Sequence, residues 1–487
     1  MSLPKNKTLI FGDEKMAVYS IIKLSELEGA KRIDADFYKP DYFIDFSKGV
    51  WRPIKEFLSI CQYGISQAMT EEPRGCPIFR MDDIKDCFLL DDEIKYVDTS
   101  SQVLSQFKLE INDVLFNRVN SEEFVGRTGI FKLRGNYVFA SYLIRLRVKS
   151  DSEILPDYLN IFLNTKFGKK QIHRFSRRAV NQANVNAEEL KNFKINIVSL
   201  EIQQDISRLS DEVWGKIELS KSLYSQAENL LLEELGLKDF KPRYQKTYIA
   251  NLSNALSAHR IDAEYFQPAY EEVVEGLKKR IKVEKLKNVV SFINHGKQPY
   301  YVENGDIPVL IQKHLGSQLL SSYSEIINMP DTPKTDRNFI KNYPEYLIKP
   351  FDVLFYSVGA YLGRTNVVLE NFEAVPASFI TLIRTKKEIC NPIYLALFLN
   401  SEIGQLQSTK WKSASAQQYI YPKEIREFVI PILPLSTQQK IASLVQESYK
   451  ARKKAKELLE AAKRAVEIAI EKNEEEALKY ISKTVWN

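Results

Sequence analysis

The feature that most constrains the fold of this chain is an internal repeat: short segments of its first half recur in the same order in its second half. The segment AKRIDADFYKPDY (Ala30–Tyr42) returns as AHRIDAEYFQPAY (Ala258–Tyr270), and five shorter matches follow in the same order in both halves. One tetrapeptide can match by chance, but an ordered series indicates a duplicated unit. The shorter matches are DVLF (Asp113–Phe116, Asp352–Phe355), GRT (Gly126–Thr128, Gly363–Thr365), Ala-Ser-aromatic (Ala140–Tyr142, Ala377–Phe379), P-x-YL…FLN (Pro156–Asn164, Pro392–Asn400) and L-x-x-QQ-x-I (Leu200–Ile206, Leu435–Ile441).

The length of the repeated unit indicates two independent domains. The 487 residues are too many for one ordinary core, whereas half of them can fold around a core of their own. The spacing between matched segments drifts by a few residues, as expected when loops vary on a shared scaffold. A duplication kept only for stability is the alternative, but the unit is far longer than a solenoid repeat.

Each copy reads as a mixture of strands and helices. DVLF followed by GRT predicts a strand, a glycine turn and a second strand. Phe139–Val148 alternates like a half-buried strand, and Pro156–Phe167 predicts a helix with proline in its first turn. A polar, basic stretch follows, and a short apolar strand closes the copy. The expected fold class is therefore α+β.

A long helix follows each copy. The first is expected from Glu201 to Leu235, with Gly236 as its C-cap, and the second from about Ser436 to beyond Tyr480. Such a helix spans roughly 50–60 Å and extends beyond a domain of this size. Pairing of the two helices as an antiparallel coiled coil is therefore the simplest way to bury the apolar positions that recur every three or four residues along each helix. The apolar positions are Ile206, Leu209, Val213, Ile217, Tyr224, Ala227 and Leu231 in the first helix, and Leu444, Ala451, Ala455, Leu458, Ala462, Ala465 and Ala469 in the second.

Composition excludes several classes of protein. The net charge of +6 permits a nucleic-acid partner without requiring one. The four cysteines form no CxxC pair and the four histidines are not at ligand spacing, so no structural zinc is expected; sparse cysteine fits a reducing cytosol better than a disulfide framework. Residues 1–29 carry no signal-peptide pattern, and the chain has no long apolar span, so a cytoplasmic protein is expected.

This organisation resembles the specificity subunits of type I restriction–modification enzymes. In that family two variable target-recognition domains alternate with two helical spacers, and a proline-containing segment leads into each helix. Pro434–Ile441 matches that entry well, whereas Ser199–Ile206 lacks the proline. The resemblance implies an N-terminal extension (1–29), recognition domain 1 (30–200), a central spacer helix (201–238), a linker (239–257), recognition domain 2 (258–434) and a C-terminal spacer helix (435–487).

The resemblance also implies a function. It implies a non-catalytic subunit that reads a bipartite double-stranded DNA target, with the helices setting the gap between half-sites. The expected partners are two methyltransferase subunits and motor–nuclease subunits. Because this chain has no glycine-rich cofactor loop, it is expected to bind no cofactor itself, with S-adenosylmethionine and ATP/Mg on the partners. Val466, Ile468 and Ile470 lie beside the alanine seam and are expected to dock the methyltransferase.

The candidate DNA contacts are basic and amide residues in segments that are expected to be exposed. Cations bind phosphates, and arginine, asparagine and glutamine read base edges. The segments His173–Asn184 and Lys410–Gln418 occupy matching places and avoid acids, although a solvated basic loop is the alternative. The Arg127 and Arg364 of the GRT turns could equally hold a carboxylate, and Arg32 and Arg260 of the RIDA segments are expected to be structural. The candidates are Tyr63, Arg80, Arg118, Arg127, Arg174, Arg177, Arg178, Asn181, Gln182 and Asn184 in copy one, and His295, Lys297, Gln312, Lys313, His314, Arg364, Lys410, Lys412, Ser413, Gln417 and Gln418 in copy two.

Two other classes of function stay open from the sequence. One is a stand-alone DNA nuclease or methyltransferase with an unrecognised site, and the other is a helical scaffold with no DNA role. Asn391–Tyr394 superficially matches an amino-methyltransferase motif, but its counterpart Leu155–Tyr158 shows that the proline marks a helix start. Glu93–Lys95 supplies only the tail of a nuclease motif.

Overall fold

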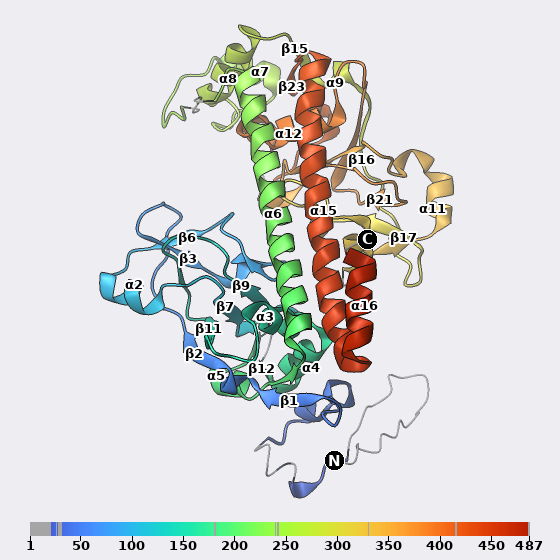
Figure 1. The fold of residues 1–487 in the computed structure, drawn as a ribbon. Coiled ribbons are helices and arrows are strands. Elements are labelled where there is room, and N and C mark those ends of the chain that lie inside the picture. The colour runs from blue at the N-terminus through green and yellow to red at the C-terminus, as the bar shows by residue number, and fades with distance from the viewer. Residues whose placement is uncertain are drawn as a thin grey trace. The chain divides into compact units, whose positions relative to one another are not determined.

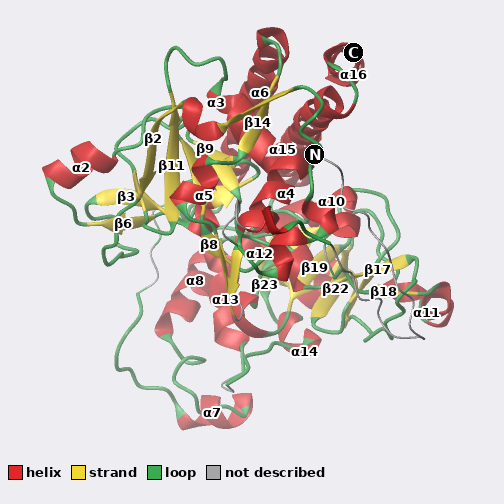
Figure 2. Cartoon of the chain, turned by 90° about the horizontal axis from the view of Figure 1, so that it is seen from below, coloured by secondary structure: helices red, strands yellow, loops and turns green. Residues whose placement is uncertain are grey.

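Two compact units make up the chain in a computed structural model. Unit 1 comprises residues 1–217 and 454–487, and unit 2 comprises residues 218–453. The structure describes residues 21–25, 27, 32–179, 182–238, 240, 243–329, 331–413 and 416–485. Each unit is a mixed assembly of sheets and helices, so the expected α+β class is confirmed (Figures 1 and 2).

Unit 1 is built on a six-stranded sheet in the order β2-β11-β7-β9-β5-β4. Its strand β11 (Leu143–Val148) is buried on both faces over its first four residues, because the core that includes Ile144 and Leu146 lies on one side and the core that includes Leu143 on the other. The half-buried strand expected over Phe139–Val148 is therefore corrected: Phe139 ends β10 of another sheet, and β11 is a central strand that begins at Leu143. The other strands are β2 (Leu58–Tyr63), β4 (Ile84–Lys85), β5 (Phe88–Leu89), β7 (Val114–Asn117) and β9 (Thr128–Ile130).

Smaller elements of unit 1 surround that sheet. Three small sheets have the orders β1-β14, β10-β3-β6 and β12-β13-β8. Their strands are β1 (Val50–Pro53), β14 (Lys194–Ile197), β10 (Val138–Phe139), β3 (Cys76–Phe79), β6 (Lys95–Val97), β12 (Arg177–Ala179), β13 (Gln182–Asn184) and β8 (Val119–Asn120). The helices are η1 (Ala35–Tyr38), η2 (Pro40–Tyr42), η3 (Ile54–Glu56), η4 (Met81–Asp83), α2 (Ser101–Phe107), α3 (Pro156–Asn164), α4 (Lys166–Phe175) and α5 (Ala187–Lys191).

Unit 2 repeats this plan with fewer strands. Its main sheet has the order β16-β22-β19-β20, and two small sheets have the orders β15-β23 and β18-β17-β21. Its strands are β15 (Val283–Lys285), β16 (Val290–His295), β17 (Ile307–Leu310), β18 (Lys334–Thr335), β19 (Val353–Tyr356), β20 (Thr365–Val367), β21 (Val375–Pro376), β22 (Ile380–Thr385) and β23 (Val429–Pro431). Its helices are α7 (Leu252–Ala258), α8 (Pro268–Lys278), α9 (Leu286–Val289), η5 (Gln312–His314), α10 (Tyr323–Asn328), α11 (Arg337–Asn342), η6 (Pro344–Tyr346), η7 (Gly359–Tyr361), α12 (Pro392–Asn400), α13 (Glu402–Trp411) and α14 (Pro422–Ile425).

Two long helices contribute to both units. They are α6 (Leu200–Glu234) and α15 (Leu435–Glu471), drawn green and red in Figure 1. In unit 1 the first half of α6 shares a core with the second half of α15, and in unit 2 the second half of α6 shares a core with the first half of α15. The two helices therefore run antiparallel, as expected. In unit 2 the hydroxyl of Ser448 donates to the carbonyl of Ser220 across the pair, at 2.8 Å.

The end of the second long helix differs from the expectation. The helix stops at Glu471, and a separate helix α16 (Glu474–Val485) follows it. Ala477 and Ile481 of α16 belong to the same core as Val466 and Ile468, which are buried, and Ile470 packs against that core. The interpretation of Val466, Ile468 and Ile470 as a partner-docking face is corrected accordingly, because the second neighbour of this helix is a segment of the same chain.

The repeated motifs hold the same contacts in both units. The buried Gln203 accepts from the backbone N–H of Leu155 at 2.8 Å, and the buried Gln438 accepts from that of Asn391 at 2.7 Å. Each glutamine therefore ties the start of a long helix to the start of the helix that follows the main sheet. The motif L-x-x-QQ-x-I recurs because this junction recurs.

The RIDA arginines are structural, as predicted. Arg32 forms a forked pair with Asp34 and donates to the carbonyl of Phe175 at 2.9 Å. Arg260 forms the same pair with Asp262 and donates to the carbonyl of Lys412 at 2.8 Å. In each unit the motif therefore fastens the start of the copy to the end of α4 or α13.

Candidate nucleic-acid interface

One edge of unit 1 gathers residues that are far apart in the sequence. The strand β8 leaves the main sheet directly after β7 and pairs with β13, where Val119 lies opposite Asn184. The N–H of Val185 donates to the carbonyl of Arg118 at 2.9 Å, and Tyr63 lies close by at the end of β2. We call this cluster, made of Tyr63, Arg118, Asn120, Arg177, Gln182 and Asn184, the unit 1 edge.

Arg118 is the central residue of the unit 1 edge. Its guanidinium lies 4.9 Å from the centre of the Tyr63 ring and donates to Asn184 Oδ1 at 3.4 Å and to the carbonyl of Ser141 at 3.2 Å. The Tyr63 hydroxyl accepts from the N–H of Ala187 at 2.8 Å, while the ring remains 40% exposed. Arg118 therefore orients an exposed aromatic ring and an amide side chain at the same surface.

The strands β12 and β13 add further polar groups to this edge. Arg177 is largely exposed and pairs with Glu189 at 3.0 Å, and Gln182 is exposed. Asn181 and the side chain of Arg178 lie outside the described residues. Donors and acceptors capable of reading base edges thus share one small sheet with two arginines.

Unit 2 builds the corresponding edge on the same backbone plan. Val358 bridges Tyr419 as Val119 pairs with Asn184, and the N–H of Ile420 donates to the carbonyl of Ser357 at 2.9 Å. Gln417 and Gln418 are exposed there, and the Gln418 carbonyl accepts from Gly359. Ser413 accepts from the N–H of Tyr419 through its hydroxyl, at 3.1 Å. We call His295, Ser413, Gln417, Gln418, Tyr419 and Tyr421 the unit 2 edge.

A different side-chain set fills the unit 2 edge. His295 ends β16, in the place that Tyr63 takes at the end of β2. Its Nδ1 lies 3.1 Å from the hydroxyl of Thr381, which lies 2.7 Å from the hydroxyl of the buried Ser357. Burial lowers the pKa of His295, so its imidazole is neutral near pH 7. The cation and amide of unit 1 are thus replaced by an imidazole and a hydroxyl chain.

Other candidates of unit 2 make contacts outside the set that defines this edge. Gln312 accepts from the Tyr356 hydroxyl at 3.0 Å, Lys313 is exposed beside it, and Lys297 is exposed with its ammonium 5.0 Å from the Tyr343 ring centre. His314 is 0% exposed: its Nδ1 accepts from the N–H of Ile311, and its Nε2 lies 3.2 Å from the Thr332 hydroxyl. His314 therefore lies in the interior, and we leave it out of the proposed surface.

The GRT arginines have matching roles. Arg127 lies 3.8 Å from the centre of the Phe124 ring, and Arg364 lies 4.2 Å from that of Tyr361. Arg364 also donates to the carbonyl of Leu315 at 3.1 Å. In the described part of the chain neither forms a salt bridge, so the alternative in which they hold their turn through a carboxylate is not what the structure has.

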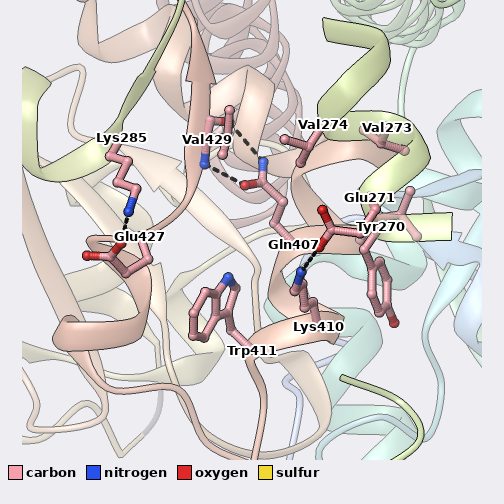
Figure 3. A pocket seen from close by; sticks show the side chains of 11 residues that line it. Tyr270, Glu271, Val273, Val274, Lys285, Gln407, Lys410, Trp411, Glu427 and Val429 are labelled. Atoms are coloured by element: carbon pink, nitrogen blue, oxygen red, sulfur yellow. Dashed lines mark hydrogen bonds and ion pairs between the residues drawn. The ribbon is translucent and has the colours of Figure 1, made fainter. Parts of the chain in front are cut away.

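Arg174 and Lys410 occupy matching positions on α4 and α13 and face inward. Arg174 lies 4.5 Å from the Phe37 ring centre. Lys410 pairs with Glu271 at 2.5 Å across a cavity of about 350 Å³ between α8 and α13, with Trp411 at its side (Figure 3). Both cations are engaged within their own unit. Lys412, at the end of α13, holds Arg260 through its carbonyl.

Arg80 is a capping residue. It forms a salt bridge at 2.9 Å with Asp83, which is buried, and it donates to the carbonyl of Glu93. Two features of these edges were not predicted from the sequence: Asn120, which donates to the Met81 sulfur, and the edge-to-face pair Tyr419 and Tyr421. The aromatic doublet at the end of the basic segment was the available signal for these tyrosines.

No group of three or more potential metal ligands occurs among the residues that the structure describes. The four cysteines are all free thiols. Neither the long helices nor any other described helix has an apolar stretch that could cross a bilayer.

Comparison with known proteins gives a consistent result. The family model for the type I restriction modification DNA specificity domain matches twice, over residues 52–229 and 278–462. A putative type I restriction enzyme MjaX specificity subunit of Methanocaldococcus jannaschii is 24% identical over 88% of this chain and 96% of its own length. The EcoKI specificity subunit of Escherichia coli K12 is 25% identical over 33% of this chain and 35% of its own. A solved S subunit of M. genitalium covers 88% of this chain and 97% of its own, at 12% identity and a TM-score of 0.42.

Proposed function

The chain belongs to the type I restriction–modification DNA specificity family, and from that premise we propose that it reads a bipartite DNA target with the unit 1 edge and the unit 2 edge. It is a specificity subunit, so its role is to recognise DNA and not to catalyse. Each of the two family matches covers one copy of the repeat together with most of the long helix that follows it.

One observation carries the assignment of these edges. At the same place on the same backbone plan, each unit presents an exposed glutamine, Gln182 or Gln417, in a cluster that also contains an aromatic side chain. Glutamine and asparagine read adenine in the major groove, and arginine reads guanine or binds phosphate. Because the scaffolds match while these side chains differ, the two edges are expected to read different half-sites.

The unit 1 edge is the better suited to direct readout. Arg118 holds Asn184 in place, and the adjacent Gln182 is free of the core. A pre-oriented amide loses less conformational freedom on binding. In the unit 2 edge, the exposed Gln417 and Gln418 lie beside Tyr419, which offers contact with a thymine methyl or a sugar.

The test is a paired substitution with the base preference as the readout. Gln182→Ala should relax the preference at one or two positions of one half-site, and Gln417→Ala should do so only at the other, each by about 1–3 kcal/mol per lost base contact. The measurement is selection of bound sequences from a random DNA pool, at fixed salt. Gln102→Ala on α2 and Gln318→Ala, both exposed, are matched controls. Unchanged preferences in both edge variants would contradict the assignment.

The duplication also bears on the partners. As a subunit of a type I complex, the chain works with methyltransferase and restriction subunits, and we propose two methyltransferase subunits because each unit can offer an equivalent surface to one copy. S-adenosylmethionine is proposed to bind the methyltransferase, and ATP with Mg the motor–nuclease. We expect the complex in the cytoplasm, with the genome. Methyl transfer by the isolated chain would contradict this division of labour.

The paired helices are proposed to set the unread spacer. A helix is stiff along its axis, and the α6–α15 core defines the register of the pair in each unit. Inserting about one heptad into both helices should lengthen the spacer and leave the read bases unchanged. A change of bases without a change of spacer would contradict the proposal.

A further inference from the structure

Exposed aliphatic side chains lie just before the RIDA motif and at its isoleucine in both copies. In unit 2, Ile249, Leu252, Leu256 and Ile261 are 99%, 72%, 66% and 92% exposed. The helix α7, which carries two of them, has no buried residue and lies at the periphery of unit 2 (Figure 2). Four exposed aliphatic side chains in so short a segment are far from the scattered single exposures that are normal on a surface.

The same pattern occurs at the matching place in unit 1. Ile21, Leu24 and Ile33 are 68%, 69% and 90% exposed. Read back from the RIDA motifs, Ile21-x-x-Leu24 aligns with Ile249-x-x-Leu252. Leu24 is helical, as Leu252 is. The internal repeat thus extends upstream of the motif that first revealed it, and the exposure of the apolar side chains is repeated with it.

The position of each segment is defined by its own unit. Eight residues after Leu24 and Leu252 in the sequence, Arg32 and Arg260 fasten the chain to the ends of α4 and α13. In unit 2 the backbone turns at His259, whose φ of +51° ends α7. In unit 2 the apolar side chains of α7 are therefore presented next to a fixed anchor.

We propose that these two segments are docking sites for two identical copies of the methyltransferase subunit, one on each unit. A face that a chain presents twice, at the same place in an internal repeat, fits a partner that is present twice. A partner present in one copy would leave one of these two faces unoccupied, and binding of restriction subunits instead is an outcome that the crosslinking experiment below distinguishes. The inference rests on the proposed function, since it takes the partner from there.

The variants follow from the exposure values. Ile21→Glu with Leu24→Glu disables the first face, and Leu252→Glu with Leu256→Glu disables the second. These side chains are exposed, so the chain should keep its fold. Ile111→Glu and Ile327→Glu, on other exposed aliphatic residues, are matched controls.

The main readout is the mass of the complex between the full chain and the methyltransferase subunit. Wild type and controls should give a two-to-one complex, either double variant a one-to-one complex, and the combined variant no complex, with an affinity loss of at least tenfold per face. DNA binding by the isolated chain should be unchanged. A two-to-one complex in the combined variant would overturn the inference.

A photo-crosslinking residue at Leu256 or Leu24 gives a second readout that does not depend on the loss of binding. Crosslinks to the methyltransferase at both positions support the proposal. Crosslinks only to a restriction subunit, to a second copy or within this chain overturn it. If two methyltransferase subunits bind and methylate a specific site while both readouts fail, only this inference falls; if none binds in wild type, the proposed function falls with it.

Discussion

The two units use the same scaffold contacts, whereas their edges carry different side chains. Asp113 and Asp352 pair with Arg147 and Arg384 in the same way. By contrast, the place of Tyr63 is taken by His295. The fold therefore requires the Asp–Arg pair in both copies, whereas the residue type at the end of β2 and β16 can differ between them.

One pair of positions shows the same local role filled by different chemistry. In η4 the Asp83 carboxylate accepts from the N–H of Arg80, at 2.7 Å. In η5 the His314 Nδ1 accepts from the N–H of Ile311, at 3.0 Å. Both cap a short helix after the first strand of a small sheet, but a carboxylate and an imidazole respond differently to acid.

Breaking the shared ion pair should have the largest effect, and an equal one in the two units. Asp113→Ala and Asp352→Ala should each cost about 3 kcal/mol, because removing one partner of a buried pair strands the other, although each arginine stays about a fifth exposed. Hydrogen exchange of the amides in β7 and β19 reports each unit separately. Asp41→Ala, at an exposed position, is the control. Strongly unequal losses would show that the two pairs are not equivalent.

Lowering the pH should destabilise the region around η5 in unit 2 but not the region around η4 in unit 1. Burial lowers the pKa of His314 to about 4, below its ordinary 6.5, so the folded state favours the neutral ring. The neutral His314 ring therefore contributes to the free energy of unfolding in full above pH 6.5. As the pH falls toward 4 this stabilisation is lost, by roughly 3 kcal/mol in total. Burial instead raises the pKa of Asp83, so acid does not weaken unit 1 at that position.

Local hydrogen exchange around η5 and η4, followed from pH 7 to pH 4, measures this difference. His314→Asn keeps an acceptor for the Ile311 N–H and should remove the extra acid sensitivity of unit 2. Equal acid sensitivity at η4 and η5 in wild type would contradict the role given to His314.

The turn glycines should give a smaller difference. Gly126 and Gly363 have φ values of +79° and +92°, so Gly→Ala should cost more than about 1 kcal/mol at either. The cost should be higher at Gly126, since its new Cβ would meet the packed Ile172 side chain at 2.5 Å, whereas Gly363 would meet the end of Gln405 at 2.8 Å. Thermal unfolding of the variants measures this. Gly215→Ala, in the interior of α6 with open space around it, should instead stabilise by up to about 1 kcal/mol. A destabilising Gly215→Ala would count against this reasoning.

Local signals predicted the elements that depend on local structure. The apolar stripe predicted α6 within a residue at each end, and Gly236, with its φ of +64°, ends it as expected. The single helix predicted over Pro156–Phe167 was wrong, because Thr165 stops α3 and caps α4 through the N–H of Gly168. The basic stretch that follows is therefore helical as far as Phe175.

By itself the sequence determined that there are two copies, that two long helices accompany them and that the RIDA arginines are structural, because repeats, periodicity and short-range pairing are written along the chain. Only the tertiary structure decided which polar candidates share a surface. Tyr63, Arg118 and Asn184 meet through strand pairing between distant segments. His314 and Val466 are buried by segments that the local sequence around them does not predict. Burial depends on the packing of elements that are far apart in the sequence. Tertiary packing therefore decided which side chains reach the surface and can contact a partner.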